Sequence, residues 1–420
     1  MQFGKYLGKQ QMPFQGLHIL CIILFIVVAY HGFEYAHWGN IGKLAEKLFY
    51  AWFMFCFVSM QTKRYECNFR GLVLFLMLVP LLSMGNTYLM YGQSLVRSFI
   101  VSMSTFTWMI YFLLHKYKVS ESSVFRALLY ISLFILAVQL VQQVTYPDIY
   151  FGGRSDDIML ENNYNENAEM RNGIWRFRMH NNAYYTAPVL FATWYWVRKK
   201  FDIRLMCIVF FLLISVYLTL TRQVMVACAF TMFFSLFTQV NNKHKMRTLL
   251  VALFLIIGLC ASYEMLFSEL AEKTSEEKTD DNIRVLAALY FFDESIQNPI
   301  VFLFGHGAAA RGSAYEKYIL DLRDLGFYIS DVGFIGQIFE RGFIFVFYFY
   351  LLVYKLFFKC KKVIPLYIRM SVLFMTMMSP MIFPIIGSST IVVWALLLYI
   401  CDLHINKSPL ALPYTTNVTQ

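Results

Sequence analysis

Charged residues are scarce in this sequence. Asp, Glu, Lys and Arg together make up 15% of the 420 residues, whereas soluble proteins contain roughly 25%. So few charges cannot cover a water-facing surface, which excludes a soluble multidomain protein. The 59% of hydrophobic residues exclude a disordered chain. The composition therefore predicts a protein that crosses a lipid bilayer many times, because helices can pair all their backbone polar groups there.

Metal and nucleotide motifs are absent as well. The sequence contains no Cys-x-x-Cys, His-Glu-x-x-His, P-loop or Gly-x-Gly-x-x-Gly pattern, so it predicts no metal and no cofactor. Its eight cysteines all fall in apolar runs or in segments expected on the cytoplasmic side, which argues against a disulfide framework. The net charge of +10 is not concentrated in a soluble tract, so nucleic acid is not an expected partner.

Long apolar runs are what the sequence has in abundance. Most approach the roughly 20 residues that a membrane helix needs. They predict an all-α, polytopic membrane protein in which residues 1–420 form a single integral membrane domain. The twelve expected spans are 14–31, 45–61, 71–86, 95–114, 124–143, 183–197, 203–219, 223–240, 247–263, 332–356, 365–380 and 385–402.

Lys and Arg are distributed unevenly between the segments that join these spans. With the N-terminus inside, the inner segments carry 21 of the 36 Lys and Arg residues but only four of the 26 Asp and Glu residues. Because cytoplasmic loops are enriched in positive charge, this alternation predicts that both termini lie in the cytoplasm. The first run lacks a small-residue cleavage site, so we expect it to remain as a membrane anchor.

Polar residues concentrate in two outer segments, 144–182 and 264–331. Long segments of this kind often form lids or binding walls, so we expect the working surface on the outer face. The first segment ends with Arg176, Arg178 and His180 among aromatic residues. Guanidinium groups bind phosphate oxygens and aromatic rings stack on sugars. The simpler alternative is a solvated loop that ends at a membrane anchor.

Two further arginines occupy positions where an anion is favoured. Arg222 lies in a turn too short to leave the membrane boundary. An arginine at this depth needs a partner such as a lipid-linked phosphate, unless it snorkels to the headgroups. Arg284 is expected in the first turn of a helix that begins after Asn282, and helix N-termini favour phosphate. A plain surface anchor is the alternative for that helix.

The second outer segment and the span after it supply the remaining candidates. His306 stands between two glycines, with Arg311 shortly after it, and histidine is a usable base near neutral pH. Asp331 precedes the tenth expected span, where it can accept a proton from a hydroxyl or simply cap the helix. Arg341, next to Glu340, is a candidate for substrate binding or for a structural charge network.

In their order, these motifs resemble those of the bacterial O-antigen polymerase and ligase superfamily, the Wzy-type proteins of surface-polysaccharide assembly. The resemblance covers 178–345, and two departures stand out: no glycine separates Arg178 from His180, and Ser330-Asp331 replaces the His-Asn typical of ligases, which favours a polymerase. Arg178–Asn182 resembles the family pattern "R-x-G-x-F-x-(H/N)-x-N", and Leu220-Thr221-Arg222 resembles "(T/G)-S-R". Arg284 with Asn298-Pro299 and Gly305-His306-Gly307 resembles "R…N-P…G-x-G". Asp331–Gly342 resembles "(H/D)-x-G…G".

The resemblance implies a membrane glycosyltransferase of the C type that uses no metal, cofactor or nucleotide sugar. Its donor is a growing glycan on undecaprenyl diphosphate, and its acceptor is one lipid-linked repeat unit. The implied reaction polymerises O-antigen or capsular or exopolysaccharide on the periplasmic face of the bacterial inner membrane. Membrane lipid surrounds the protein, and a chain-length regulator is a further candidate partner.

The implied chemistry assigns roles to the candidates. Displacement at the anomeric carbon needs positive charge on the leaving diphosphate and a base near the acceptor hydroxyl. By resemblance, Arg222 and Arg284 form the diphosphate clamp, and Asp331 is the first candidate for the base. The remaining candidates are His306 and His180 as reserve bases, and Arg178, Arg176, Arg311 and Arg341 as substrate-binding residues.

Two other functions stay open. A ligase that transfers finished glycan to another acceptor needs the same clamp and differs only in the acceptor. A transporter or flippase for lipid-linked sugars belongs to another class, and such proteins often show two similar halves with sites at mid-membrane. The sequence shows no such repeat and places its polar residues on one side, which favours the enzyme.

Overall fold

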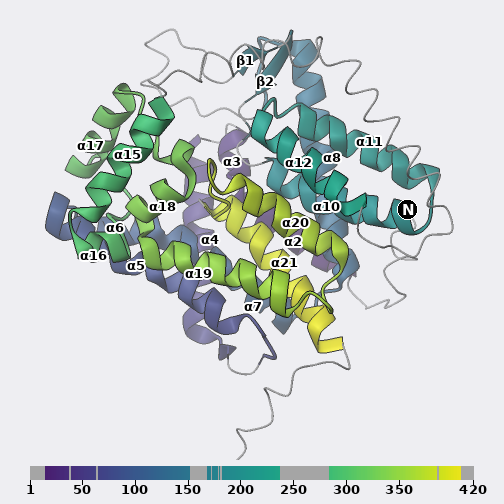
Figure 1. Cartoon of the computed structure of the whole chain (residues 1–420), viewed down its shortest axis with the longest axis horizontal. Coiled ribbons are helices and arrows are strands. Elements are labelled where there is room, and N and C mark those ends of the chain that lie inside the picture. Colours follow the sequence, from purple (N-terminus) through teal and green to yellow (C-terminus); the bar gives the residue numbers. More distant parts are fainter. Residues whose placement is uncertain are drawn as a thin grey trace, which may run out of the picture.

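The computed structural model describes residues 15–36, 39–62, 65–151, 168–171, 173–177, 179, 182–236, 283–385 and 387–407. Helices dominate this part of the chain, and its two short strands form one antiparallel hairpin. Figure 1 shows the hairpin at the top of the molecule and the C-terminal end of α21 at the bottom. The helical part of the fold prediction is therefore confirmed.

The elements follow one another in chain order. The helices are α2 (Gln15–Ala29), α3 (Gly32–Tyr35), α4 (Gly39–Ser59), α5 (Arg70–Tyr91), α6 (Leu95–Ser102), η2 (Met103–Trp108), α7 (Met109–Lys116), α8 (Glu121–Thr145), α10 (Asn182–Lys199), α11 (Ile203–Tyr217), α12 (Arg222–Leu236), α15 (Ile283–Ile296), α16 (Pro299–Phe304), α17 (Ala314–Asp324), η3 (Ile329–Val332), α18 (Gly333–Arg341), α19 (Phe343–Tyr354), η4 (Lys355–Lys359), α20 (Leu366–Met378) and α21 (Ser388–Lys407). The strands are β1 (Ala168–Arg171) and β2 (Ile174–Phe177).

Four helical rods among the described residues are long and apolar enough to cross a membrane: α5, the continuous rod from α6 to α7, α8, and α21. The shorter helices α2, α11, α12 and α20 are also apolar. Large apolar side chains point outward, among them Val58, Leu89 and Val144, which are 78%, 79% and 86% exposed. Extensive exposed apolar surface fits contact with lipid. Both features are those of a membrane protein.

The helices occupy the expected apolar runs with shifted ends. The run expected at 71–86 continues as α5 to Tyr91, and the run expected at 385–402 begins later and continues as α21 to Lys407. The expected span 247–263 lies outside the described residues. Helix ends are set by caps and tertiary contacts, which apolar periodicity does not reveal.

The expected single span at 332–356 is wrong. The chain forms two helices there, α18 and α19, which are separated at Gly342. Gly342 has a φ of +86°, and an added Cβ would lie 2.2 Å from the carbonyl oxygen of Leu303. Only glycine adopts this conformation readily at such a close contact. Arg341 therefore lies at the end of a helix rather than inside a continuous membrane span.

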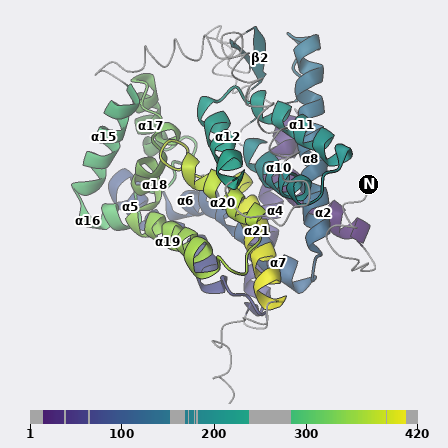
Figure 2. The same ribbon diagram turned by 45° about the vertical axis from the view of Figure 1, so that its right-hand side comes forward.

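The main core surrounds α21. In the apolar stretch of α21, 83% of the residues are buried. The helix packs against α2, α7, α8 and α10. α10 is enclosed in turn by α8, α11 and α20. In Figures 1 and 2, α15 to α18 lie on one side of the central helices α20 and α21, whereas α8 and α10 to α12 lie on the other.

The helices from α15 to α18 have a small core of their own. Its members come from α15, α17, η3 and α18, and Tyr91 at the end of α5 packs against them. The buried residues of this core are Ala287, Phe291, Tyr315, Ile319, Leu322, Val332 and Phe339. This core gives a fixed position to the elements that carry Arg284, His306 and Asp331.

Candidate functional site

The hairpin of β1 and β2 places two arginines side by side. Its register pairs Arg171 with Ile174 and Glu169 with Arg176. Residues directly opposite share a face of a ladder, and so do residues two apart along one strand. Arg171 and Arg176 therefore lie on the same face. The two residues between the strands are Asn-Gly in the sequence, the pair that favours the tightest hairpin turns.

The hairpin is anchored to the last turns of α8. The backbone N–H of Trp175 donates to Oε1 of Gln143 at 2.9 Å, and Nε2 of the same amide donates to the carbonyl oxygen of Trp175. The ring of Trp175 also stacks on Tyr146, with centroids 3.7 Å apart. These contacts fix the hairpin on α8, while its arginine face turns toward the connection between α11 and α12.

Both hairpin arginines bind the turn between α11 and α12. Arg171 donates from Nη1 to the carbonyl oxygen of Leu220 at 3.1 Å. Arg176 donates from Nε to the carbonyl oxygen of Thr219 at 3.1 Å and from Nη2 to the hydroxyl of Thr221 at 3.3 Å. The fork of a guanidinium suits such paired acceptors. The contacts bring Arg171 and Arg176 next to Arg222, which follows Thr221 directly.

The turn itself has an unusual backbone. Leu220 has a φ of +46° although it is not glycine, and its side chain is fully buried. A left-handed conformation costs such a residue on the order of 1–2 kcal/mol, so the surrounding contacts must over-determine it. Burial of the Leu220 side chain and the bond from Arg171 to its carbonyl oxygen supply that support. The turn thus has a fixed shape at the point where α12 begins.

Arg222 is the first residue of α12. The N–H groups of a first helical turn have no partner inside the helix and carry partial positive charge. Arg171, Arg176 and Arg222 are all partly buried, which weakens screening by solvent. We define these three residues and the N-terminus of α12 as the arginine cluster. Its chemistry suits a phosphate or diphosphate group.

Arg284 and Asp331 lie on neighbouring elements. Arg284 is in the first turn of α15, and α15 packs against η3, which contains Asp331. The carboxylate of Asp331 is exposed and accepts a hydrogen bond from the hydroxyl of Ser330 at 3.0 Å. The N-cap position of α18 is Val332, so the simple capping role considered for Asp331 is not what the structure shows. An exposed carboxylate can contact a substrate.

His306 is fully buried between α5 and α18. Its Nδ1 lies 2.8 Å from the hydroxyl of Tyr91, and its ring lies 4.2 Å from that of Phe339 between centroids. Burial lowers the pKa of His306 to about 4, so its imidazole is neutral at pH 7. A base must touch the hydroxyl that it deprotonates, and in this conformation the ring does not face solvent.

The segment around His306 is held by α5. The hydroxyl of Thr87 donates to the carbonyl oxygen of His306, and the amide of Asn86 donates to that of Gly305 at 2.8 Å. Gly307 has a φ of +86°, and an added Cβ would lie 2.1 Å from the Thr87 hydroxyl. The close backbone approach that these glycines permit is therefore to α5 rather than to a ligand.

Arg341 and Arg311 differ sharply in their surroundings. Arg341 is buried, donates from Nη1 to the carbonyl oxygen of Ile385 at 3.1 Å and lies 5.1 Å from the Phe345 ring centroid. Arg311 is exposed ahead of α17. The contacts of Arg341 tie α18 to the connection before α21. Substrate binding by either residue stays a prediction, as do the roles of Arg178 and His180, which lie outside the described residues.

Sequence reasoning missed one residue that shapes this region and one charged pair elsewhere in the fold. Gln143 anchors the hairpin. The Asn-Gly pair at 172–173 was the signal that could have revealed the hairpin turn. His31 and Glu46 form another pair, with Nδ1 and Oε2 2.7 Å apart and the Glu46 side chain only 5% exposed. A carboxylate at the start of an apolar run was the signal there.

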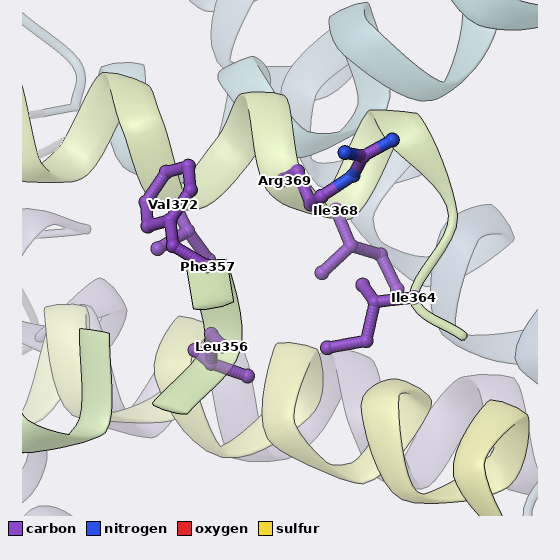
Figure 3. Close-up of a pocket in the computed structure, with 6 residues that line it drawn as sticks. All are labelled: Leu356, Phe357, Ile364, Ile368, Arg369 and Val372. Atoms are coloured by element: carbon purple, nitrogen blue, oxygen red, sulfur yellow. The ribbon is translucent and has the colours of Figure 1, made fainter. Parts of the chain in front are cut away.

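A small apolar recess lies between η4 and α20. Figure 3 shows that the guanidinium group of Arg369 points away from the other lining side chains, which are all apolar. The lining residues are Leu356, Phe357, Ile364, Ile368, Arg369 and Val372. This recess offers no polar group to a sugar or a phosphate, and the arginine cluster is the better candidate site.

No protein-family model matches the chain, and no curated protein matches it significantly.

Proposed function

We propose that the protein is a polymerase of the O-antigen polymerase and ligase superfamily. In this proposal it joins polyprenyl-diphosphate-linked oligosaccharide units into a surface polysaccharide by metal-independent glycosyl transfer. The fold is then of the C type, with about twelve spans in the bacterial inner membrane and both termini in the cytoplasm. One observation carries the proposal: Arg171 and Arg176 both bind the turn that leads directly into Arg222, the first residue of α12.

The arginine cluster supports binding of the leaving diphosphate. In the proposed step, the acceptor hydroxyl oxygen attacks the anomeric carbon while the bond from that carbon to the diphosphate oxygen breaks. The lipid diphosphate leaves with the electron pair of the broken bond, so negative charge increases on its oxygens. Arginines at fixed positions stabilise that charge, and each charge-assisted hydrogen bond contributes about 1.5–3 kcal/mol.

Asp331 is the proposed acceptor of the hydroxyl proton. Its carboxylate is exposed, and its element η3 packs against α15, which begins with Ile283 and Arg284. In this scheme Arg284 binds a second phosphate or the acceptor lipid near the base. A fully buried His306 is a weaker choice for the base, because a substrate hydroxyl cannot reach its ring in the observed conformation.

The proposed polymerase is tested by deleting the gene from its host and comparing the length distribution of the surface glycan on gels. Collapse of a long ladder to a single repeat unit supports the polymerase. If polymer persists on the lipid carrier without reaching its final anchor, the protein is a ligase that uses the same arginines. If single units accumulate on the inner leaflet, it is a transporter, and the proposed use of the arginines is wrong.

A further inference from the structure

The C-terminal end of α21 lies at the opposite end of the molecule from the hairpin (Figure 1) and carries a buried carboxylate. Asp402, near the C-terminal end of α21, is fully buried. Its Oδ2 lies 3.1 Å from Nε2 of His115 and accepts a hydrogen bond from the hydroxyl of Tyr111, both on α7. Its Oδ1 accepts from the backbone N–H of Asn68 at 3.3 Å. These contacts hold both oxygens in fixed directions.

A thiol completes the group. Cys67 precedes Asn68 in the connection between α4 and α5, and it is partly buried. Its Sγ, one imidazole nitrogen of His115 and one carboxylate oxygen of Asp402 all lie within 4.8 Å of one another. Three different ligand types from three distant parts of the sequence therefore face a common point.

We propose that Cys67, His115 and Asp402 bind one divalent transition-metal ion of the Zn²⁺ type. Zinc prefers thiolate, imidazole and carboxylate ligands in a tetrahedral arrangement. This donor set excludes Mg²⁺ and Ca²⁺, which require oxygen ligands. Asn68 and Tyr111 orient the carboxylate from outside, as partners of metal ligands commonly do.

The geometry needs one adjustment. Ligand atoms of a tetrahedral zinc site are roughly 3.3–3.8 Å apart, given bonds of about 2.0–2.3 Å. The 3.1 Å between His115 and Asp402 is already close to this value. The Sγ atom of Cys67 must move inward by about 1.5 Å at most, from within 4.8 Å of the other ligand atoms. A rotation of its side chain accomplishes this, because Cys67 belongs to a connection rather than to a helix.

Charge also favours the ion. Asp402 supplies one negative charge, and Cys67 supplies a second when its thiol releases a proton as the ion binds, so together they neutralise a divalent cation. A buried cation with paired ligands avoids the large penalty of an isolated charge. The bound ion links the 65–69 connection, α7 and the end of α21. With three protein ligands the fourth position is left to water, and the ion ties these elements together independently of the proposed glycosyl transfer.

The test uses the purified full-length protein in detergent, stripped of metal with a chelator and titrated with Co²⁺ alone. Tetrahedral cobalt bound to a thiolate shows a charge-transfer absorption that cobalt in water lacks. We expect one equivalent of Co²⁺ per chain with this absorption, and a rise in the thermal unfolding temperature. Cys67→Ser must abolish the absorption. Cys207→Ser is the control, because Cys207 is an exposed thiol on α11.

Two results would overturn the inference. The first is an unchanged thiolate absorption in Cys67→Ser, which means that another cysteine holds the ion. The second is the absence of stoichiometric binding by the wild-type protein. His115→Gln provides a second variant in which the thiol remains, and it must weaken Co²⁺ binding at least tenfold. None of these readouts depends on glycosyl transfer, so the failure of one proposal does not affect the other.

Discussion

Arg176 donates from Nε to the carbonyl oxygen of Thr219 at 3.1 Å, across 43 positions of sequence. This bond joins the hairpin to the turn that precedes α12. It makes the position of one cationic side chain depend on the shape of a turn whose central residue, Leu220, has a positive φ. Substitutions at either partner should therefore affect the whole arginine cluster.

Arg176→Gln should strongly reduce polysaccharide formation. The variant loses the positive charge and the fork that bind the leaving diphosphate, which corresponds to about 1.5–3 kcal/mol and a rate reduction of roughly 10- to 150-fold. Glycan length on gels, with protein expression checked in membranes, measures the effect. Arg323→Gln on α17 is the control, because Arg323 carries the same charge, is exposed to solvent and lies outside the cluster. Equal activity of both variants contradicts the clamp.

Asp331→Asn should abolish activity without unfolding the protein. The substitution removes a proton acceptor, and general base catalysis contributes roughly 10²- to 10⁴-fold. The side chain is exposed, so the thermal unfolding temperature should stay unchanged. Asp324→Asn, at the exposed end of α17, is the control and should retain activity. Full polymer length in Asp331→Asn would show that this carboxylate is not the base.

Stability should fall in mild acid because of His306. Burial lowers the pKa of His306 to about 4, from an ordinary value of 6.5. The unfolded state therefore binds more protons than the folded state between these two values, and the free energy of unfolding decreases as pH falls from about 6.5 toward 4. The loss is on the order of 3 kcal/mol. Unfolding temperatures measured across this range should depend less on pH in His306→Gln than in the wild-type protein.

A control for that measurement replaces His18, which is partly exposed on α2. His18→Gln shows how far the loss of a partly exposed histidine changes the measurement. If His306→Gln changes the pH dependence no more than His18→Gln does, His306 is not the group responsible for the acid sensitivity.

Gly342→Ala should destabilise the protein severely. The φ of +86° and the contact of 2.2 Å between an added Cβ and the Leu303 carbonyl oxygen act together. Backbone strain alone costs about 1–3 kcal/mol. Gly85→Ala is the control, since Gly85 lies inside α5 and an added Cβ there meets no atom within 4 Å. It should raise stability by roughly 0.5–1 kcal/mol. Thermal unfolding in detergent compares the two.

Helices were the predictable part of this fold. Apolar runs located α5, α8 and α21 because each run is long and few charges interrupt it. The division at Gly342 was not predictable from hydrophobicity, because Glu340, Arg341 and Gly342 interrupt an otherwise apolar run that is long enough for one span. It depends on a contact with Leu303, which is close only in the folded chain.

The candidate site was predictable only in part. Arg222 could be selected because it lies in a short turn between two apolar runs, and Arg176 because it stands between Trp175 and Phe177. Their common turn required the hairpin register. The group around Asp402 could not be found by spacing. Its members at positions 67, 115 and 402 share no local motif, and only the packing of the last helix against α7 brings them together.

The central place of α21 has a consequence for the biogenesis of the protein. The hydroxyl of Ser388, at the start of α21, donates to the carbonyl oxygen of Ala29 in α2, 359 positions earlier. At ribosomal rates of about 5–20 residues per second, roughly 20–70 seconds separate the synthesis of these two partners. The earlier helices must wait in the membrane for the helix that fills their centre. A chain truncated before α21 should therefore be recognised as an orphan and degraded, even though the arginine cluster is already complete.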